Sequence, residues 1–135
     1  MTAQRAGNTM SDARRTRILV IDDDANVREV LLHLLASFGY DVHASADPVS
    51  GLTRFKEGGW DLVLVDVVMP AMSGWGVVER IRQYAPTTAI VLMTGMNQPI
   101  VMQRARDWRL PVIVKPFRAD AIRAIVVGAL GAKPV

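Results

Sequence analysis

Apolar residues along this chain follow two patterns that alternate from one end to the other. Uninterrupted apolar runs of about four to eight residues are typical of strands buried on both faces of a sheet. Such runs predict strands at 17–21, 41–45, 62–65, 89–93 and 111–114. The second run contains more polar residues than the others, which favours a position near the edge of the sheet.

Between and after the runs, apolar residues return every three or four positions, as they do in amphipathic helices. The first such helix should follow Asp24 and end at Gly39, because glycine readily adopts the left-handed conformation that ends a helix. Its predicted buried face comprises Val27, Val30, Leu31, Leu34, Leu35 and Phe38. Asp24 itself is expected to supply negative charge at the helix N-terminus.

The other predicted helices also begin and end at residues that favour helix boundaries. The second should begin at Pro48, with Asp47 as its cap, and end at the glycine pair 58–59. Its apolar positions are Val49, Leu52 and Phe55. The remaining helices are expected from near Gly74 to just before Pro86, from Pro99 to about Trp108, and over the last apolar pattern, 122–130.

Alternation of strands and helices predicts an α/β fold with a parallel sheet covered by helices on both faces. Right-handed crossovers leave few topologies, and the flavodoxin-like order 2-1-3-4-5 suits five strands flanked by five helices. A chain of 135 residues suits one domain, expected at 17–131. Residues 1–16 have few large apolar groups and predict a disordered N-terminal tail, and 132–135 a C-terminal tail.

Composition narrows the class of protein. Half of the residues are hydrophobic, yet no apolar run is long enough to span a membrane and no signal peptide is evident. The absence of cysteine excludes disulfides and thiolate metal sites and fits a reducing compartment. We therefore expect a cytoplasmic protein without a membrane partner.

The formal net charge of +3 is distributed unevenly along the chain. Residues 1–16 carry a net +2, residues 17–96 carry −4, and residues 97–135 carry +5. The acidic middle could hold a cation, and the basic last third could face an acidic partner or form a solvated surface. We favour the solvated surface, and no aromatic interleaving or compact basic motif indicates binding to nucleic acid.

Polar residues follow four of the five predicted strands. Asp22 and Asp23 follow the first strand, Asp66 the third, Thr94 the fourth and Lys115 the fifth. Taken alone, Asp66 could simply cap a turn. In a parallel sheet, however, the carboxyl ends of the strands open on one edge, so these side chains should converge there.

The expected convergence has chemical consequences. Three neighbouring carboxylates repel one another unless a cation or a proton intervenes. Hard oxygen ligands suit Mg²⁺, which retains several waters. Together with the ammonium group of Lys115 and the hydroxyl of Thr94, such a cluster is suited to handling a phosphoryl group.

Several short motifs then carry a family resemblance over roughly residues 17–131. They are Asp22-Asp23, Asp66, Met69-Pro70, Gly74, Thr94 and Lys115-Pro116-Phe117. In this order and spacing the chain resembles the receiver domain of two-component response regulators, of the stand-alone, single-domain type. The resemblance implies a CheY-like fold that matches the predicted topology.

The resemblance also implies roles for individual residues. Asp66 would accept a phosphoryl group from a sensor histidine kinase or a histidine phosphotransfer protein in a Mg²⁺-dependent reaction. Thr94 would donate a hydrogen bond to the phosphoryl group, and Lys115 would neutralise its charge. The implied metal ligands are Asp22, Asp23, Asp66 and the backbone carbonyl of Val68.

The sequence departs from the family pattern near the fifth strand. Val112 stands where the family usually has an aromatic residue, Trp108-Arg109 replaces a Gly-Ala pair, and Gly95 follows Thr94 in place of alanine. The usual coupling of threonine to a moving aromatic ring is therefore not expected. We expect the signal to travel through the loop at 94–95 and the helix that follows it.

Two other classes of function were weighed against a signalling domain. An aspartyl-phosphate phosphatase would need an acid two residues after its nucleophile, where this chain has Val68. A flavodoxin-like cofactor binder would need a phosphate-binding loop where this chain has Asp22-Asp23-Asp24. We therefore expect a phosphoacceptor that signals by a conformational change or relays the phosphate. At most it would catalyse its own phosphorylation and slow autodephosphorylation.

Expectations about partners follow from the last third of the chain. With the fold ending near residue 131, we expect no DNA-binding output domain, and a monomer or weak dimer. A downstream protein should bind the basic face formed by the fourth helix, fifth strand and fifth helix. Trp108 is either partly exposed on that face or packed beneath the neighbouring loop. We expect His33, His43, Trp60 and Trp75 to have no catalytic or cofactor role.

Overall fold

The computed structural model describes residues 15–70, 72–95 and 99–131. Most of the N-terminal tail predicted at 1–16, and the whole C-terminal tail predicted at 132–135, lie outside the described residues. The strands are β1 (Arg17–Ile21), β2 (Asp41–Ser45), β3 (Leu62–Asp66), β4 (Ala89–Thr94) and β5 (Val112–Val114). The helices are α1 (Ala25–Ser37), α2 (Pro48–Lys56), α3 (Gly74–Tyr84), α4 (Pro99–Asp107) and α5 (Ala119–Gly131). None of these helices combines the length and the apolar character needed to span a bilayer.

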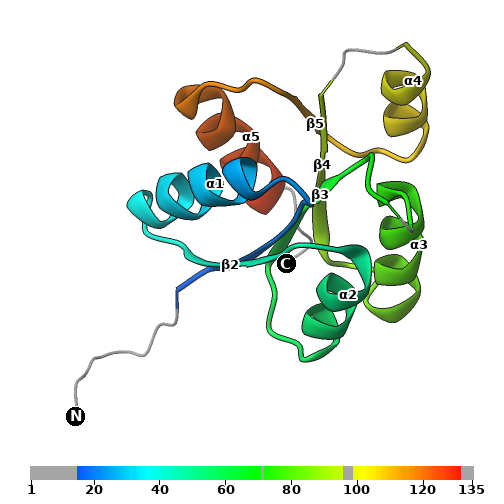
Figure 1. Ribbon diagram of the computed structural model, residues 1–135, viewed down its shortest axis with the longest axis horizontal. Helices are drawn as coiled ribbons and strands as arrows, with labels where there is room; N and C mark the ends of the chain where they lie inside the picture. Colours follow the sequence, from blue (N-terminus) through cyan, green and yellow to red (C-terminus); the bar gives the residue numbers. More distant parts are fainter. Residues whose placement is uncertain (1–14, 71, 96–98, 132–135) are drawn as a thin grey trace.

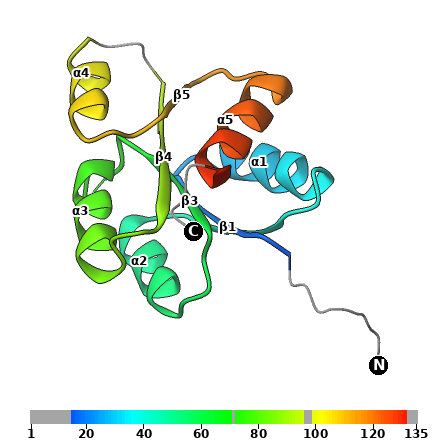
Figure 2. The same ribbon diagram turned by 180° about the vertical axis from the view of Figure 1, so that it is seen from behind.

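The strands form one parallel sheet in the order β2-β1-β3-β4-β5, which confirms the predicted fold. Helices α1 and α5 cover one face of the sheet, and α2, α3 and α4 cover the other (Figure 1). The view from behind shows the same two layers (Figure 2). Strand β2 is an edge strand, as its polar residues predicted.

The core has two layers because successive side chains of a strand point to opposite faces. In β1, Leu19 and Ile21 pack into the layer beneath α2, α3 and α4, whereas Ile18 and Val20 pack into the layer beneath α1 and α5. All four side chains are fully buried. A strand buried on both faces must be apolar throughout, which is why the uninterrupted apolar runs located the sheet correctly.

Polar side chains cap the helices where the sequence indicated helix starts. Asp24 accepts hydrogen bonds from the backbone N–H groups of Asn26 and Val27 at the start of α1. Asp47 accepts one from Ser50 at the start of α2. Gly39 has φ of +98°, the left-handed conformation predicted for the residue that ends α1.

Some boundaries and burials differ from the predictions. Asp66 and Thr94 are the last residues of their strands rather than the residues after them, and Pro111 lies outside β5. Val30 and Val49 were predicted to be buried but are 51% and 65% exposed. The buried stripes of these helices are narrower than the predicted faces, because only side chains aimed straight at the sheet are fully covered.

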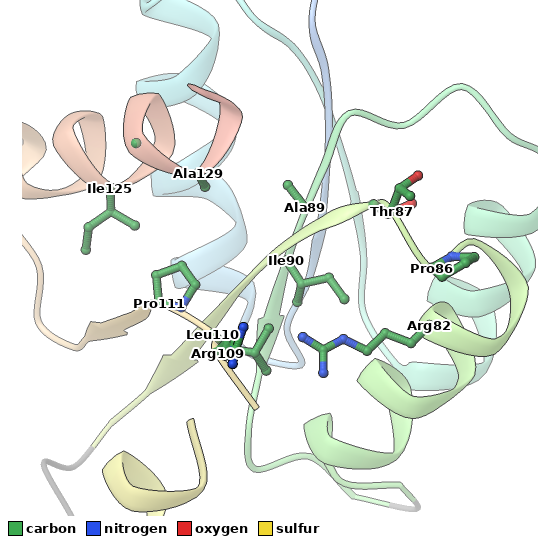
Figure 3. A pocket seen from close by; sticks show the side chains of 12 residues that line it. Arg82, Pro86, Thr87, Ala89, Ile90, Arg109, Leu110, Pro111, Ile125 and Ala129 are labelled. Atoms are coloured by element: carbon green, nitrogen blue, oxygen red, sulfur yellow. The ribbon is translucent and has the colours of Figure 1, made fainter. Parts of the chain in front are cut away.

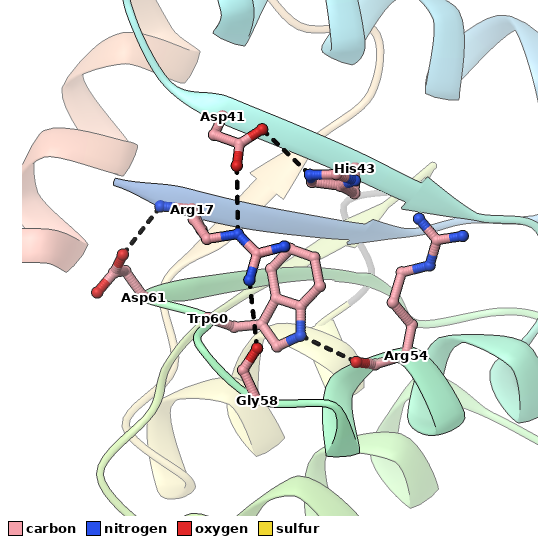
Figure 4. Close-up of polar contacts among 7 residues, drawn as sticks. All are labelled: Arg17, Asp41, His43, Arg54, Gly58, Trp60 and Asp61. Atoms are coloured by element: carbon pink, nitrogen blue, oxygen red, sulfur yellow. Dashed lines mark hydrogen bonds and ion pairs between the residues drawn. The ribbon is translucent and has the colours of Figure 1, made fainter. Parts of the chain in front are cut away.

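The amino-terminal edge of the sheet is held by a polar network around Arg17 (Figure 4). The Arg17 guanidinium donates to Asp41 Oδ2 at 3.2 Å and to the Gly58 carbonyl at 3.3 Å. It also lies 4.2 Å from the ring centroid of Trp60, whose indole N–H donates to the Arg54 carbonyl. The network therefore ties β1 to β2 and to the loop that enters β3.

At the opposite edge, α3 begins in very close contact with the end of β3. The Gly74 N–H donates to the Val67 carbonyl at 2.8 Å. A β-carbon at Gly74 would lie 2.8 Å from the Val67 α-carbon and closer still to the Asp66 carbonyl oxygen. Only glycine leaves room for this approach, so Gly74 helps to fix the backbone at Asp66.

We predict that Gly74→Ala lowers the free energy of unfolding by about 1–3 kcal/mol, because the added methyl group would overpack the end of β3. Gly128→Ala is the matched control, since nothing lies within 4 Å of its β-carbon position on α5. That variant should be stabilised by about 0.5–1 kcal/mol through helix propensity. Urea unfolding of both variants measures the difference, and equal stabilisation of both would contradict the prediction.

Candidate functional site

Three carboxylates meet at the carboxyl-terminal edge of the sheet. Asp22 directly follows β1, and Asp66 ends the neighbouring strand β3. One carboxylate oxygen from each of Asp22, Asp23 and Asp66 lies within 4.8 Å of the others. Asp22 is fully buried and Asp66 is 5% exposed, whereas Asp23 lies at the surface. The cluster is thus a mostly buried acidic site with one side open to solvent.

Lys115 supplies positive charge to this cluster. Its Nζ lies 2.9 Å from Asp22 Oδ2 and 3.4 Å from Asp66 Oδ2. The Lys115 backbone N–H donates to the Thr94 carbonyl at 2.7 Å, and the Thr94 side chain is buried. The structure therefore brings all five strand-end residues singled out in the sequence to one edge of the sheet.

Backbone groups orient the two buried carboxylates. The Asp24 N–H donates to Asp22 Oδ1 at 2.9 Å, and the Val68 N–H points to Asp66 Oδ1 at 3.4 Å. The Val68 side chain is 73% exposed. An apolar side chain turned to solvent is compatible with a residue that acts through its backbone.

One residue of the site was not found from the sequence. The guanidinium of Arg28, on the second turn of α1, donates to the Asp22 carbonyl at 2.8 Å. It braces the segment that carries Asp22 and Asp23. The only signal in the sequence was its position four residues after the helix cap Asp24, which places both on one side of the helix.

Crowding of negative charge alters how the site binds protons. Burial, followed by the negative charge of Asp22, raises the pKa of Asp66 to about 6, although Lys115 opposes the change. Burial alone would lower the pKa of Lys115, but its hydrogen bond and charge interaction with Asp22, and attraction to Asp66, hold that pKa above its usual value. The lysine therefore stays charged while the carboxylates retain an excess negative charge.

The donor set suits a small divalent cation. Three carboxylates against one ammonium group leave net negative charge in a confined space, and their oxygens are the ligand type that Mg²⁺ prefers. Few protein ligands are available, which fits an ion that keeps several waters. The residues present therefore fit Mg²⁺.

The two histidines and Trp60 have contacts outside this acidic cluster. His33 is exposed and lies 3.2 Å from Glu29 on α1. His43 is on the edge strand, with Nε2 3.1 Å from Asp41 Oδ1. Trp60 is buried in the core, as expected of a packing residue.

Trp108 lies beside α3. Its ring packs against Trp75 of α3, with ring centroids 5.2 Å apart, and it is only half-buried. The Arg104 guanidinium lies 5.0 Å from the Trp75 ring and 5.6 Å from the Trp108 ring. The partial exposure expected of Trp108 is confirmed, but its ring packs against α3 rather than beneath the loop before β5.

We predict that Asp66→Asn stabilises the metal-free protein at pH 7 by about 3 kcal/mol, since the pKa of this carboxyl rises by about two units and one unit is worth about 1.4 kcal/mol. Because the pKa of Asp66 rises from 3.8 to about 6 on folding, the folded state holds the proton more tightly than the unfolded state. The loss of folding stability caused by ionising Asp66 is absent below about pH 4 and nearly complete at pH 7.

Urea unfolding with a chelator at pH 4 and pH 7 checks this prediction. The increase in the free energy of unfolding of Asp66→Asn over the wild type should be present at pH 7 and small at pH 4. Asp120→Asn, at an exposed position on α5, serves as the control and should change stability little at either pH. If Asp66→Asn were no more stable than the wild type at pH 7, the ionised Asp66 carboxylate would not be the source of the destabilisation.

Comparison with known proteins agrees with the geometry. The transcriptional regulatory protein DltR of Streptococcus agalactiae is 35% identical over 109 residues, which are 80% of this chain and 49% of DltR. The chemotaxis protein CheY of Bacillus subtilis is 32% identical over 108 residues, which are 78% of this chain and 90% of CheY. The chain spans about half the length of the first curated relatives it matches.

A solved structure similar to this one is the response regulator TrrA of Thermotoga maritima in complex with Mg²⁺ and BeF. It has a TM-score of 0.77 and 31% identity, and the match covers 84% of this chain and 98% of TrrA. The family model of the response regulator receiver domain matches residues 18–127. Since this match spans most of the chain and agrees with the fold and the acidic edge, the chain belongs to the family of response regulator receiver domains.

Proposed function

We propose that Asp66 is the phosphoacceptor of this receiver domain and that the domain spans residues 17–131. The observation that carries the proposal is the buried strand-end carboxylate of Asp66, with two further carboxylates within 4.8 Å and Lys115 Nζ at 3.4 Å. Receiver domains are signalling domains rather than classical enzymes, and they interact with histidine kinases or phosphotransfer proteins. A donor of either kind is the proposed source of the phosphoryl group.

The chemistry asked of Asp66 is nucleophilic. A carboxylate oxygen attacks phosphorus of a phosphohistidine, an O–P bond forms, and the P–N bond breaks as the imidazole leaves with its electron pair and takes up a proton. With its pKa raised to about 6, Asp66 is mostly ionised at pH 7 and therefore able to attack. Lys115 offsets charge on the phosphoryl oxygens, and Thr94 donates a hydrogen bond to one of them.

Receiver domains bind Mg²⁺ at an acidic pocket, and the acidic cluster of this chain fits that ion. The proposed ligands are Asp22, Asp23, Asp66 and the backbone carbonyl of Val68. A bound Mg²⁺ would supply positive charge that draws a phosphoryl group towards the carboxylates. Arg28 and the Asp24 N–H keep the Asp22 segment in the geometry that this requires.

The biological setting follows from the sequence rather than from the site. A cytoplasmic location and a monomer or weak dimer stay predictions. So does the choice between an output regulator and a phosphate relay. The whole-protein activities of the longer relatives are not carried over, because this chain matches only about half of their length.

The proposed route from Asp66 to a partner passes through α4. Val112 is β-branched and has few side-chain rotamers, so it cannot swing as a ring would. Trp75 directly follows Gly74, whose backbone contacts the end of β3. The Trp75 ring packs against the ring of Trp108, just after α4. These contacts connect the phosphorylation site to α4 on the α3 side, in addition to the loop after Thr94.

The proposed docking face for a downstream protein remains the one formed by α4, β5 and α5. Its exposed residues include Ile100, which is 78% exposed. Two exposed arginines accompany it, Arg106 and Arg118, whereas the Arg123 guanidinium lies 5.1 Å from the Phe38 ring at the end of α1. Trp108 is removed from this face, because its ring packs against α3.

We predict that acetyl phosphate with Mg²⁺ adds one phosphoryl group to the wild-type protein and none to Asp66→Asn, which lacks the nucleophilic oxygen. A chelator should stop labelling of the wild type without unfolding it. Intact-mass and peptide mass spectrometry locate the label. Asp107→Asn, at an exposed acid outside the cluster, should be labelled like the wild type. Wild-type labelling of Asp66→Asn would overturn the assignment.

We also predict that a beryllofluoride phosphoryl mimic changes tryptophan fluorescence mainly through the Trp75–Trp108 pair. Trp108→Phe should lose most of the change, because it removes one ring of the pair. Trp60→Phe should keep it, because Trp60 lies in the network at the opposite edge of the sheet. In NMR spectra, amides of α4 should shift more than that of Val112. Shifts confined to the acidic cluster would contradict this route.

A further inference from the structure

A second pocket lies at the edge of the sheet opposite to the acidic cluster (Figure 3). It has a volume of about 420 Å³ and opens where β4 and β5 begin. Arg82 reaches into it from α3, Arg109 and Leu110 enter from the segment between α4 and β5, and α5 contributes Ile125 (Figure 3). Nothing in the proposed phosphorylation chemistry uses this pocket.

All the charged residues that line this pocket are positive. Two of its twelve residues are arginines, Arg82 and Arg109, and none is acidic. Within the described part of the chain, neither guanidinium forms an ion pair with a carboxylate. Glu79 and Asp107 line the neighbouring groove on the other side of the arginines, where Asp107 accepts a hydrogen bond from Gln103. Two like charges beside a pocket without a counter-charge favour an anion.

Arg82 is already held in place. Its Nη2 donates to the Trp108 carbonyl at 2.8 Å, so α3 stabilises the carboxyl end of α4 through this side chain. A guanidinium has five N–H donors, and this bond uses one of them. The side chain is half-buried and points towards Ile90 and Leu110 (Figure 3). It can therefore contact a ligand without losing much further rotamer freedom.

Arg109 occupies a backbone conformation that costs energy for any residue except glycine. Its φ is +58°, and no other non-glycine residue within 15–70, 72–95 and 99–131 has a positive φ. It directly follows the end of α4, where the Arg109 N–H donates to the Arg106 carbonyl and the Leu110 N–H to the Ala105 carbonyl. This helix-ending arrangement favours glycine. A strained arginine in its place indicates that the side chain has a use.

The remaining surface of the pocket is mainly apolar. Leu110 and Ile90 are 8% and 5% exposed and form part of its floor, and Ile125 and Ala129 of α5 complete one wall. Thr87 and Thr88, which carry hydroxyl groups, also line the pocket. Pockets that bind small molecules commonly combine an apolar lining with a few polar groups that fix the orientation of the ligand.

We propose that this pocket binds a small organic anion, a carboxylate or a phosphate monoester attached to a compact apolar group. The anionic head lies between Arg82 and Arg109, and the apolar group lies against Leu110, Ile90 and Ile125. Arginine donors match the geometry of carboxylate and phosphate oxygens. Since the pocket is distant from Asp66, the proposal does not depend on the phosphoacceptor assignment.

Titration of the full chain with phenyl phosphate and with benzoate, followed by amide NMR, tests the proposal. Saturable shifts are expected around residues 86–90, 109–111 and 125–129. Inorganic phosphate should bind several-fold more weakly than phenyl phosphate, because it leaves the apolar floor uncovered. Sodium chloride at matched ionic strength should give no saturable shift. Shifts that rise linearly for every salt would show nonspecific screening and would overturn the proposal.

Arg109→Gly is the decisive variant, because glycine suits the backbone conformation and the variant should fold at least as stably as the wild type. It should bind phenyl phosphate about tenfold or more weakly through the lost charged hydrogen bonds. Arg106→Gln removes an exposed arginine of α4 that does not line the pocket, and it should bind normally. Unchanged affinity in Arg109→Gly would overturn the proposal, whereas its labelling at Asp66 should be unaffected.

Discussion

The contacts of Lys115 with Asp22 and Asp66 are the interaction on which the candidate site depends. They join the ends of three strands that are far apart in the sequence, and they offset only part of the negative charge gathered there. Two buried carboxylates are tolerated at this edge because an ammonium group lies between them and the third carboxylate faces solvent. A site with this residual charge attracts additional positive charge.

The two edges of the sheet affect the stability of the fold in opposite directions. At the amino-terminal edge, Arg17 joins β1, β2 and the loop before β3 through hydrogen bonds and a cation–π contact, all of which stabilise the fold. At the carboxyl-terminal edge, burial and then the negative charge of Asp22 raise the pKa of Asp66, which lowers stability at neutral pH. Stability at one edge therefore allows the other to hold an arrangement of charges that is unfavourable by itself.

Periodicity in the sequence located the strands, because burial on both faces imposes an unambiguous apolar pattern. The strand order, and with it the edge where Asp22, Asp66 and Lys115 meet, followed from the right-handed crossovers of a parallel sheet. Helix faces were less well predicted, as the exposed Val30 shows. Features that depend on distant residues had little local signal. The direction of the Trp108 ring is set by how α3 and α4 pack, and no spacing rule encodes it. The Arg28 contact with the Asp22 carbonyl had only the weak signal of its spacing from Asp24.

The strand order β2-β1-β3 has a consequence for protein synthesis. By the time residue 66 has left the ribosome, the chain contains three neighbouring strands and every carboxylate of the acidic cluster. Lys115 follows only seconds later, at translation rates of about 5–20 residues per second. A nascent amino-terminal half that folded early would have to gather its carboxylates without their lysine. Charge repulsion should therefore delay closure of this edge until the last strand emerges, so that folding of the domain is completed from its carboxyl-terminal end.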